Sequence, residues 1–330
     1  AAMEDAPSQA REYKIHVLRK KSVKLTLKID PADTVITLKD ADSKKLKAEN
    51  GVYTLKAEET YSYVAVKAGY VTKKDTISVT EDTEKTITME KAPESTRKEV
   101  AAAWKNFRNS DDNMGITSAK TPTSEATTYE KWFKKLGSGW GAAPSVQIIV
   151  DNSLIVMSAN HIYKLDLNTG DILQTGDMVA ATNFGYTPPT YADGMIFAPL
   201  ADGRVQAFNA ETLESLWVYQ DTLKGQSLSP ITYSDGYIYT GFWNAETKDA
   251  NYVCIPVTDE DPTNAQEAKE AAWQYTSLGG FYWAGSVVRG DYVVFGTDDG
   301  TSGSDGTGHV LSLNKKTGEV MDSVDVIGDQ

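Results

Sequence analysis

Short runs of alternating apolar and polar residues recur in one order between residue 144 and the C-terminus. Each unit contains four short strands, with a tight turn after the first and a Thr-Gly or similar turn before the last. A period of about 40–45 residues with four strands predicts the blades of a β-propeller. Two Asp-Gly pairs between apolar runs favour two-residue hairpins. The units begin, 45, 41 and 56 residues apart, at Pro144, Pro189, Pro230 and Ser286.

The N-terminal part has a different pattern. Residues 21–92 hold six or seven alternating runs at short spacing, which predicts a small β-sandwich. The lysines between the apolar positions are typical of protected edge strands and a solvated face. Residues 1–20 contain a single alternating run, either an added edge strand or a remnant of a preceding sandwich of cadherin-like type. Residues 93–103 are predicted to be a linker with a short helical turn.

The propeller part, residues 104–330, opens with a segment that lacks a complete unit. Residues 128–136 alternate around Trp132, and we expect them to form the outermost strand of a blade. No further set of inner strands follows Val326. We therefore expect an all-β chain in which a small sandwich precedes four visible repeats of an incomplete propeller. Four repeats that close irregularly are the alternative.

The repeats also resemble a known family. The stretches LDLNTGDILQ (165–174), FNAETLESLW (208–217) and LNKKTGEVMD (313–322), with the lead-in WKNFRNSDDNMGIT (104–117), are similar to PQQ-like repeat propellers. That family includes quinoprotein alcohol dehydrogenases and the outer-membrane assembly propeller lipoprotein. The resemblance implies that Trp217 and Trp273 dock neighbouring blades.

The sandwich resembles PEGA-type and Ig-like modules of bacterial surface proteins. The similarity lies in DPADTVITLKD (30–40), GVYTL (51–55) and YVAVKAGYVTKKDTISV (63–79). The Pro-Glu-Gly-Ala signature itself is absent, and Pro31-Ala32-Asp33 stands in its place. A surface location is what this resemblance implies.

Charge and composition narrow the classes of partner. The 330 residues carry a net charge of −13, made up of +2 over residues 1–100 and −15 over residues 101–330, and the acidic second part disfavours a nucleic-acid partner. The single cysteine, Cys254, lies in an apolar run and is expected to be a buried, inert thiol. No apolar run approaches the length of a membrane-spanning helix, and no signal peptide is recognisable.

Candidate binding residues come from loops that a four-stranded meander places on one face. Before the first strands stand Trp140, Tyr186, Gln226, Tyr282 and Trp283; at the start of the third strands stand His161, Arg204, Asn251 and His309. Such aromatics can line a ligand funnel or pack between blades. His161 and His309 occupy equivalent positions in different blades, so a shared metal site is not expected.

No catalytic constellation emerges from the chain. The Asp- and Gly-rich residues 297–308 lack the spacing of a calcium loop and are expected to form a hairpin. Resemblance to quinoproteins implies PQQ with calcium, but one cysteine excludes their vicinal disulfide. We therefore expect a monomeric, non-catalytic, extracellular or cell-surface bacterial scaffold without cofactor, which binds protein or glycan through a propeller face. A quinoprotein fragment and an envelope assembly factor are the alternatives.

Overall fold

The computed structural model describes residues 22–182, 187–281, 283, 285–303 and 306–327. These residues contain 25 strands in six sheets and two short 3-10 helices, η1 (Glu125–Thr127) and η2 (Trp140–Ala142). The prediction of an all-β chain is confirmed. No helix among the described residues has the length and apolarity needed to cross a membrane. The terminal run within residues 1–20 lies outside the described residues.

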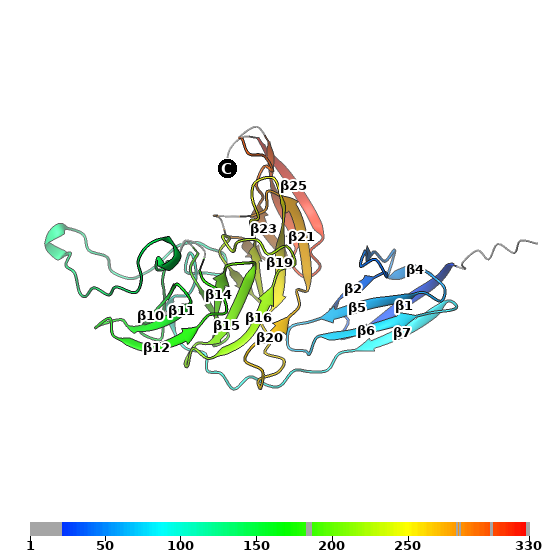
Figure 1. Cartoon of the computed structure of the whole chain (residues 1–330), viewed down its shortest axis with the longest axis horizontal. Coiled ribbons are helices and arrows are strands. Elements are labelled where there is room, and N and C mark those ends of the chain that lie inside the picture. Colours follow the sequence, from blue (N-terminus) through cyan, green and yellow to red (C-terminus); the bar gives the residue numbers. More distant parts are fainter. Residues whose placement is uncertain (1–21, 183–186, 282, 284, 304–305, 328–330) are drawn as a thin grey trace, which may run out of the picture.

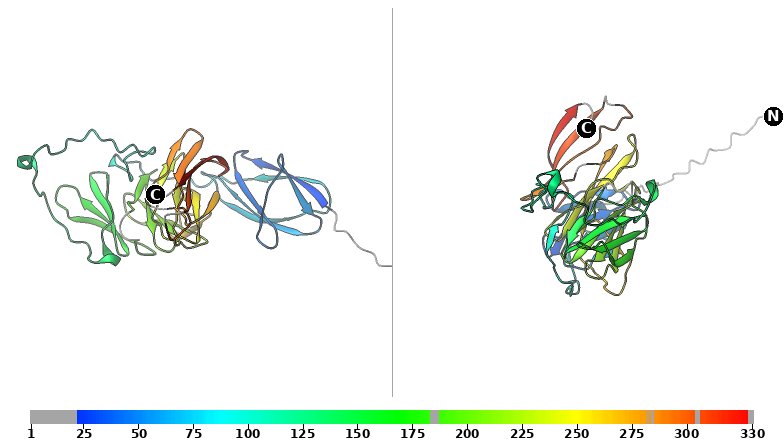
Figure 2. Two further views of the ribbon diagram at one scale, coloured as in Figure 1. Left: turned by 90° about the horizontal axis from the view of Figure 1, so that it is seen from above. Right: turned by 90° about the vertical axis from the view of Figure 1, so that its left-hand side faces the viewer.

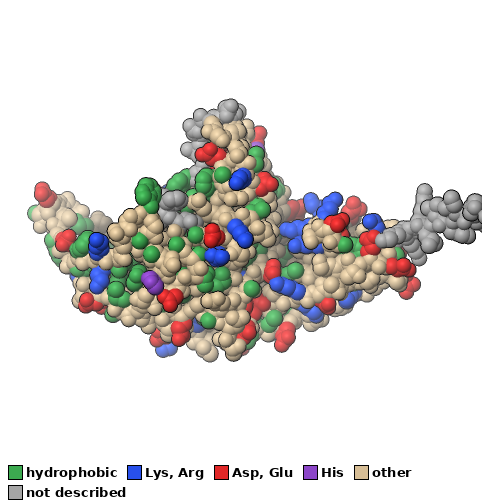
Figure 3. Space-filling view, in the orientation of Figure 1, with side chains coloured by type: hydrophobic (Ala, Val, Ile, Leu, Met, Phe, Trp, Pro, Cys, Tyr) green, Lys and Arg blue, Asp and Glu red, His purple; other side chains and the backbone are tan. Residues whose placement is uncertain are grey.

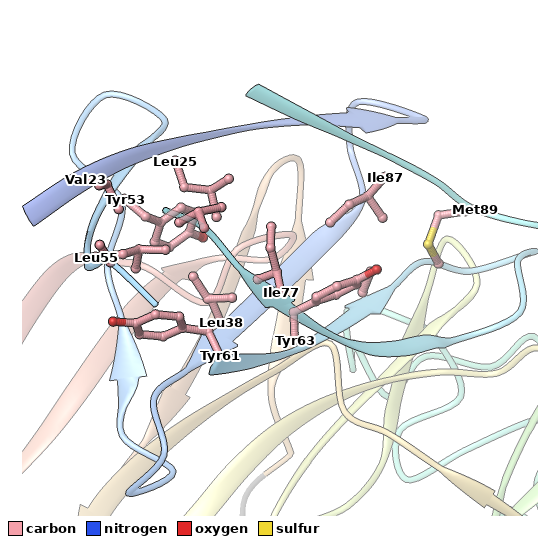
Figure 4. Close-up of a cluster of buried hydrophobic side chains, with 13 residues drawn as sticks. Val23, Leu25, Leu38, Tyr53, Leu55, Tyr61, Tyr63, Ile77, Ile87 and Met89 are labelled. Atoms are coloured by element: carbon pink, nitrogen blue, oxygen red, sulfur yellow. The ribbon is translucent and has the colours of Figure 1, made fainter. Parts of the chain in front are cut away.

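The N-terminal module is a two-layer sandwich. Its sheets run in the orders β4-β1-β7 and β3-β2-β5-β6. Side chains alternate along each strand, so one face of each sheet enters the shared core, where Leu25, Leu38 and Tyr63 are almost completely buried (Figure 4). The strands are β1 (Ser22–Asp30), β2 (Val35–Lys39), β3 (Lys45–Leu46), β4 (Val52–Lys56), β5 (Thr60–Val66), β6 (Lys73–Ser78) and β7 (Thr83–Thr88).

Lysine and acidic side chains are interspersed over the outside of the module (Figure 3, right). This mixture fits the expectation of a solvated face.

Four sheets follow, each with a core of four antiparallel strands taken in chain order, and we number them blades 1 to 4; blade 3 skips β20 (Glu267–Lys269), which joins blade 2. Blade 1 is β9 (Ile148–Val150), β10 (Ser153–Ser158), β11 (His161–Asp166) and β12 (Ile172–Asp177). Blade 2 is β13 (Thr190–Ala192), β14 (Met195–Leu200), β15 (Arg204–Asn209) and β16 (Ser215–Gln220). Blade 3 is β17 (Thr232–Ser234), β18 (Tyr237–Gly241), β19 (Asp249–Pro256) and β21 (Trp273–Leu278). Blade 4 is β22 (Val287–Arg289), β23 (Tyr292–Gly296), β24 (Thr307–Asn314) and β25 (Val320–Ile327).

The blades fan out from a common inner edge (Figures 1 and 2). The first strands of successive blades contact one another in the order β9, β13, β17, β22. Hydroxyl groups join them: Thr190 Oγ1 donates to the Ile231 carbonyl and Thr232 Oγ1 to the Ser286 carbonyl, both at 2.9 Å. The repeats are therefore successive wedges of a PQQ-like propeller, as the spacing predicts.

Tryptophans on fourth strands join each blade to the next. Trp217 Nε1 donates to the Val257 carbonyl at 3.1 Å, and Trp273 Nε1 donates to the Lys315 carbonyl at 2.9 Å. Each acceptor lies just after the third strand of the following blade. These contacts show that Trp217 and Trp273 dock neighbouring blades, as the family resemblance implies.

The prediction of a strand over residues 128–136 is wrong, because this segment pairs with no strand. Trp132 nevertheless makes the contact of a fourth-strand tryptophan: its Nε1 donates to the Leu167 carbonyl of blade 1 at 3.1 Å. A lone extended segment has no neighbour for its backbone groups, so they are left to solvent. Trp132 thus reaches blade 1 although its segment forms no sheet.

The turns before the fourth strands explain the repeated Asp/Asn-x-x-Thr-Gly pattern. The Asp166 carboxylate accepts the backbone N–H groups of the second and third residues after it, and Asn209 and Asn314 do the same through their side-chain oxygens. Gly170 has a φ of +74°, and a Cβ there would lie 2.6 Å from the Trp132 ring. The left-handed turn favours glycine, and the docked tryptophan leaves no room for a Cβ; in blade 2, Leu213 occupies the same turn position with a φ of +57°.

The lead-in covers the inner edge of the fan. Strand β8 (Ala102–Trp104) pairs with β9 as an additional innermost strand, at the boundary between the predicted linker and the predicted propeller. The Lys105 carbonyl then accepts from Tyr191 N at 2.7 Å, and the buried Asn113 Nδ2 donates to the Thr232 hydroxyl and to the Ser286 carbonyl. The helical turn predicted for residues 93–103 is absent, because the chain here is extended against the blades.

The module docks on the outer side of blades 2 to 4 through the insertion 258–270. Within this insertion, β20 (Glu267–Lys269) pairs in parallel with β16 as a fifth strand of blade 2. Lys269 is almost fully buried between Glu260 and Glu267. Glu260 also accepts the backbone N–H of Thr72 in the module, at 2.7 Å. The insertion therefore connects the two parts of the chain through buried charges.

Two further contacts hold the module in place. Val66, the last residue of the module's β5, belongs to the apolar cluster between blades 3 and 4. Arg97 Nη1 of the linker lies 2.8 Å from Asp259 Oδ2, with both side chains nearly buried. Such contacts order the module relative to the blades.

Candidate functional site

The loops leading into first strands and the loops between second and third strands interlock at one end of the blades, which we call the upper face. Ser227 Oγ donates to the carbonyls of Leu200 and Arg204, at 2.6 and 3.2 Å. Ser158 Oγ donates to the Ala142 carbonyl at 2.7 Å. The sequence prediction that these two loop classes share a face is supported by these contacts.

One polar pair per blade stands at the upper end of the third and fourth strands, and we call these the rim pairs. The members of each pair are directly opposite in the strand register. Their separations are 2.7–3.0 Å, in His161–Asp177, Arg204–Gln220, Asn251–Thr276 and His309–Asp325. The structure thus places the four third-strand candidates at one repeated position.

The fourth-strand partners in the rim pairs were missed by sequence reasoning. A signal existed: in blades 1, 2 and 4 the partner follows 16 residues after the third-strand residue. Blade 3 departs from this spacing because its insertion lies between the two strands. A periodic search of both strands would have identified the pairs.

The aromatic candidates divide between exposure and packing. Trp140, in η2, and Trp283 are 74% and 52% exposed, as a recognition surface requires. Phe281 is instead buried, with its ring centroid 5.3 Å from that of Tyr252, so it packs between blades 3 and 4. Tyr186 and Tyr282 lie outside the described residues. Blade packing therefore accounts for Phe281, whereas ligand contact stays a prediction for the exposed Trp140 and Trp283.

Gln226 is held by its backbone. Its N–H and carbonyl both bond to Trp243, at 2.6 and 2.9 Å. This small bridge fixes the loop before blade 3 against the loop between the second and third strands of that blade.

The buried titratable groups in this region are structural. Asp221 is completely buried, and its carboxylate accepts from Asn251 Nδ2 and Leu223 N, each at 2.9 Å. Burial raises the pKa of the Cys254 thiol far above its usual range. Neither group is poised for acid–base or nucleophilic chemistry.

Metal ligation is not indicated by the described part of the chain, which holds no cluster of three or more His, Cys, Asp or Glu side chains. His161 and His309 belong to blades 1 and 4, and each is engaged with an aspartate of its own blade. The family resemblance implies PQQ with calcium as cofactor. His161, His309 and their aspartates do not form a ligand set for it.

A cleft of about 920 Å³ lies away from the upper face, between the linker and blades 2 and 3. Tyr70, Pro93, Leu216 and Asp259 are among its lining residues. A smaller hollow of about 200 Å³ separates the module from Tyr219 and Trp273. Sequence reasoning missed both, because their walls come from segments more than a hundred residues apart.

Fold and repeat geometry together define the class: the chain carries a PQQ-like repeat β-propeller. Residues 123–246 match the family model described as outer membrane protein assembly factor BamB. No curated protein matches the chain.

Several solved structures are similar in fold. They include quinohemoprotein alcohol dehydrogenase ADHIIG from Pseudomonas putida HK5 (14% identity, TM-score 0.44, 57% of this chain and 34% of that chain). BamB from Moraxella catarrhalis is also similar (17%, 0.40, 55% and 51%), as is a europium-containing methanol dehydrogenase (15%, 0.43, 58% and 44%). The matches span about a third to a half of these proteins.

Proposed function

We propose that this protein is a non-catalytic binding scaffold of the bacterial cell envelope or cell surface, which recognises a protein partner through the upper face. The observation that carries the proposal is a face that combines two exposed tryptophans with three accessible rim pairs, those of blades 1, 2 and 4. Asn251 of the blade 3 pair is buried and bonded to Asp221, so this pair is structural. Each pair is held by a cross-strand contact, so its hydrogen-bonding groups are fixed on a rigid sheet before a partner arrives. Tryptophan and arginine are also the residues that most often dominate binding energy at protein interfaces.

A protein partner suits this surface better than a small molecule. The accessible rim pairs are distributed over blades 1, 2 and 4, so a ligand that used several of them would have to span the fan. Trp140 and Trp283 stand in loops before blades 1 and 4, at the two ends of the same face. A broad surface with separate aromatic anchors is typical of protein recognition.

Assembly of envelope proteins is the second candidate function. The match of residues 123–246 to an outer membrane protein assembly factor family favours it. It is a special case of protein recognition and would use the same face.

The test is affinity capture of envelope proteins on the purified chain, followed by measurement of the dissociation constant for each captured protein. We expect Trp140→Ala with Trp283→Ala to weaken binding at least about tenfold. Leu173→Ala is the matched control, since Leu173 is 52% exposed at the opposite end of blade 1, and it should bind as the parent does.

Two further measurements separate the alternatives. Capture that is unchanged in the double variant would contradict the proposal, and binding to a glycan array in place of proteins would change the partner class. Addition of PQQ with calcium should leave the cofactor's absorbance unaltered; a saturable spectral change would instead favour the quinoprotein alternative.

A further inference from the structure

The cleft between the linker and blades 2 and 3 has a distinct position in the molecule, and we call it the seam cleft. Its volume of about 920 Å³ falls within the range of ligand sites, ~300–1,000 Å³, and such sites often lie where two domains meet. Residues 68–70 of the module and residues 91–97 at the start of the linker form one side. On the other side Asp193 and Glu214 lie in the turns after the first and third strands of blade 2, at the opposite end from the upper face.

A buried ion pair in the wall of the seam cleft has hydrogen-bonding groups left over. Arg97 Nη1 lies 2.8 Å from Asp259 Oδ2, and the two side chains are 11% and 5% exposed. Arg97 Nε and Asp259 Oδ1 are buried as well, yet neither has a hydrogen-bond partner among the described residues. Buried polar atoms are nearly always paired, since an unpaired one keeps the full cost of its desolvation. The ion pair therefore offers one donor and one acceptor to a ligand in the cleft.

The chemistry of this pair selects a neutral amide as its ligand. An anion would accept from Arg97 Nε but would meet the Asp259 carboxylate, and a cation would meet the guanidinium in the same way. An amide carries an acceptor and a donor without a net charge, so it can serve both atoms. In an extended peptide the N–H and C=O groups of one residue point to the same side, which presents the donor and the acceptor together.

The linker adds a backbone edge beside the ion pair. It runs along the lower side of the molecule from β7 to the blades (cyan, along the bottom of Figure 1). Within the described part of the chain, residues 93–99 make no backbone-to-backbone hydrogen bond. An extended segment with unpaired backbone groups is a template for an incoming strand, which is how many proteins recognise peptides. A peptide bound at the ion pair would find further main-chain partners here.

The charge of the seam cleft indicates which side chains such a peptide carries. Five acidic and two basic side chains line the cleft. Arg97 and Asp259 compensate each other, so the acidic excess falls on more accessible side chains such as Glu94 and Glu99 of the linker. An acidic cleft attracts basic segments. Leu216 adds apolar surface, on which the aliphatic stem of a lysine or arginine can pack.

We propose that the seam cleft binds an extended, basic segment of a partner protein. One residue of this segment donates its N–H to Asp259 Oδ1 and accepts from Arg97 Nε through its carbonyl, and its neighbours pair with the backbone of residues 93–99. Lysine or arginine side chains of the segment lie beside the linker glutamates. This site goes beyond the proposed function, because it is at the other end of the blades from the upper face.

Selection from a random heptapeptide library displayed on phage, with the purified full chain as target, supplies the probe. We expect the enriched peptides to be rich in lysine and arginine. Fluorescence anisotropy with a labelled enriched peptide should show saturable binding that weakens as the salt concentration rises. A selection that yields no saturable binder, or only acidic ones, would overturn the proposal, because solvent would then suffice for the Arg97–Asp259 pair.

A steric block locates the peptide. Thr96 lines the cleft from an exposed position on the linker, so Thr96→Trp should fill the cleft and weaken binding at least about tenfold. Thr54→Trp is the matched control, since Thr54 is exposed on β4 and outside the cleft, and it should bind as the parent does. Circular dichroism should be unchanged in both variants. Full affinity of a folded Thr96→Trp chain would contradict the site.

A charge exchange tests the acidic lining. Glu94→Lys with Glu99→Lys should weaken binding at least about tenfold and reduce its salt dependence. Glu125→Lys with Glu130→Lys makes the same change of charge at exposed residues of the lead-in, where screening should limit the effect to less than about twofold. Equal effects of the two double variants would mean that the peptide follows the net charge of the chain and not the cleft.

Two measurements test recognition of the peptide backbone. Arg97→Lys keeps a cation beside Asp259 but removes the Nε donor, so it should weaken binding although the charge is unchanged. Methylation of single backbone nitrogens of the peptide should weaken binding at alternate positions, because in an extended chain every second N–H faces the same side. Full affinity of every methylated peptide would refute the main-chain contacts.

The upper-face variant separates this site from the proposed function. Trp140→Ala with Trp283→Ala should leave binding of the peptide unchanged. Loss of binding in this variant would place the peptide on the upper face and overturn the proposal for the seam cleft, while the proposed function would stand.

Discussion

Replacing Trp217 with alanine should destabilise the propeller more than replacing Trp132 with alanine. The side chain is completely buried between blades 2 and 3, and its ring centroid lies 5.7 Å from that of Phe197. Truncation removes the ring from this core and leaves the Val257 carbonyl without its 3.1 Å donor.

The size of the effect follows from these two losses. Truncating a buried tryptophan to alanine costs about 3–5 kcal/mol. A buried carbonyl that loses its partner adds roughly 1 kcal/mol or more. We therefore expect a loss of about 4–6 kcal/mol in the free energy of unfolding, a large part of the ~5–15 kcal/mol typical of a folded domain.

Urea denaturation followed by far-ultraviolet circular dichroism measures this loss. Trp132→Ala is the matched control: Trp132 makes the same Nε1-to-carbonyl contact with blade 1, but its segment is outside every sheet. Since that side chain is only half-buried, we expect about 1 kcal/mol or less.

The comparison can refute the reasoning. Equal destabilisation by the two substitutions would mean that the tryptophan contact, and not the core between complete blades, holds the repeats together. A change below about 1 kcal/mol for Trp217→Ala would show that blade 2 and blade 3 do not depend on this packing.

Three other predictions concern buried and titrating groups. Lys269→Met should destabilise the docking of the module by about 3–5 kcal/mol, because Glu260 and Glu267 lose their buried cation. Faster proteolysis of the linker would measure this loss. An unchanged rate of cleavage would contradict the role of Lys269 in holding the module. Backbone N–H groups hold the pKa of Asp166 below its usual value, and the hydrogen bond from Lys315 lowers the pKa of Asp235 in the same way. The two carboxylates therefore contribute their full stabilisation above the unfolded pKa near 3.8, and this stabilisation is lost as pH falls through the lower folded pKa. Acid denaturation should therefore move to higher pH in Asp166→Ala, and a coincident curve would exclude this role. The Cys254 thiol should react with a thiol reagent only after unfolding, since it is buried and its pKa is raised; rapid reaction of the native chain would disprove its burial.

Residues 128–136 illustrate where sequence reasoning stops. The alternating pattern around Trp132 predicts a strand, and the tryptophan does reach the neighbouring blade as a fourth-strand residue would. Strand formation failed because hydrogen bonds to a second strand are a property of the neighbourhood and not of the segment. The insertion 258–270 is the reverse case: its polar, acidic sequence has no alternating apolar pattern, yet part of it is a fifth strand of blade 2.

The rim residues show the same division. Their repeat position could be read from the chain, and the structure puts His161, Arg204, Asn251 and His309 at equivalent ends of third strands. Which aromatics would be exposed could not be read, because Phe281 and Trp283 stand two residues apart in one loop. The first packs against Tyr252 and the second faces solvent.

The sequence by itself determined the local periods: two-residue alternation for strands, Asp/Asn-x-x-Thr-Gly turns that satisfy their own backbone groups, and a recurrence near forty residues that sets the blades. Tertiary structure alone decided what covers each sheet face, because burial depends on which distant segment arrives there. That is why the buried Lys269 cluster and the seam with the module became visible only in three dimensions.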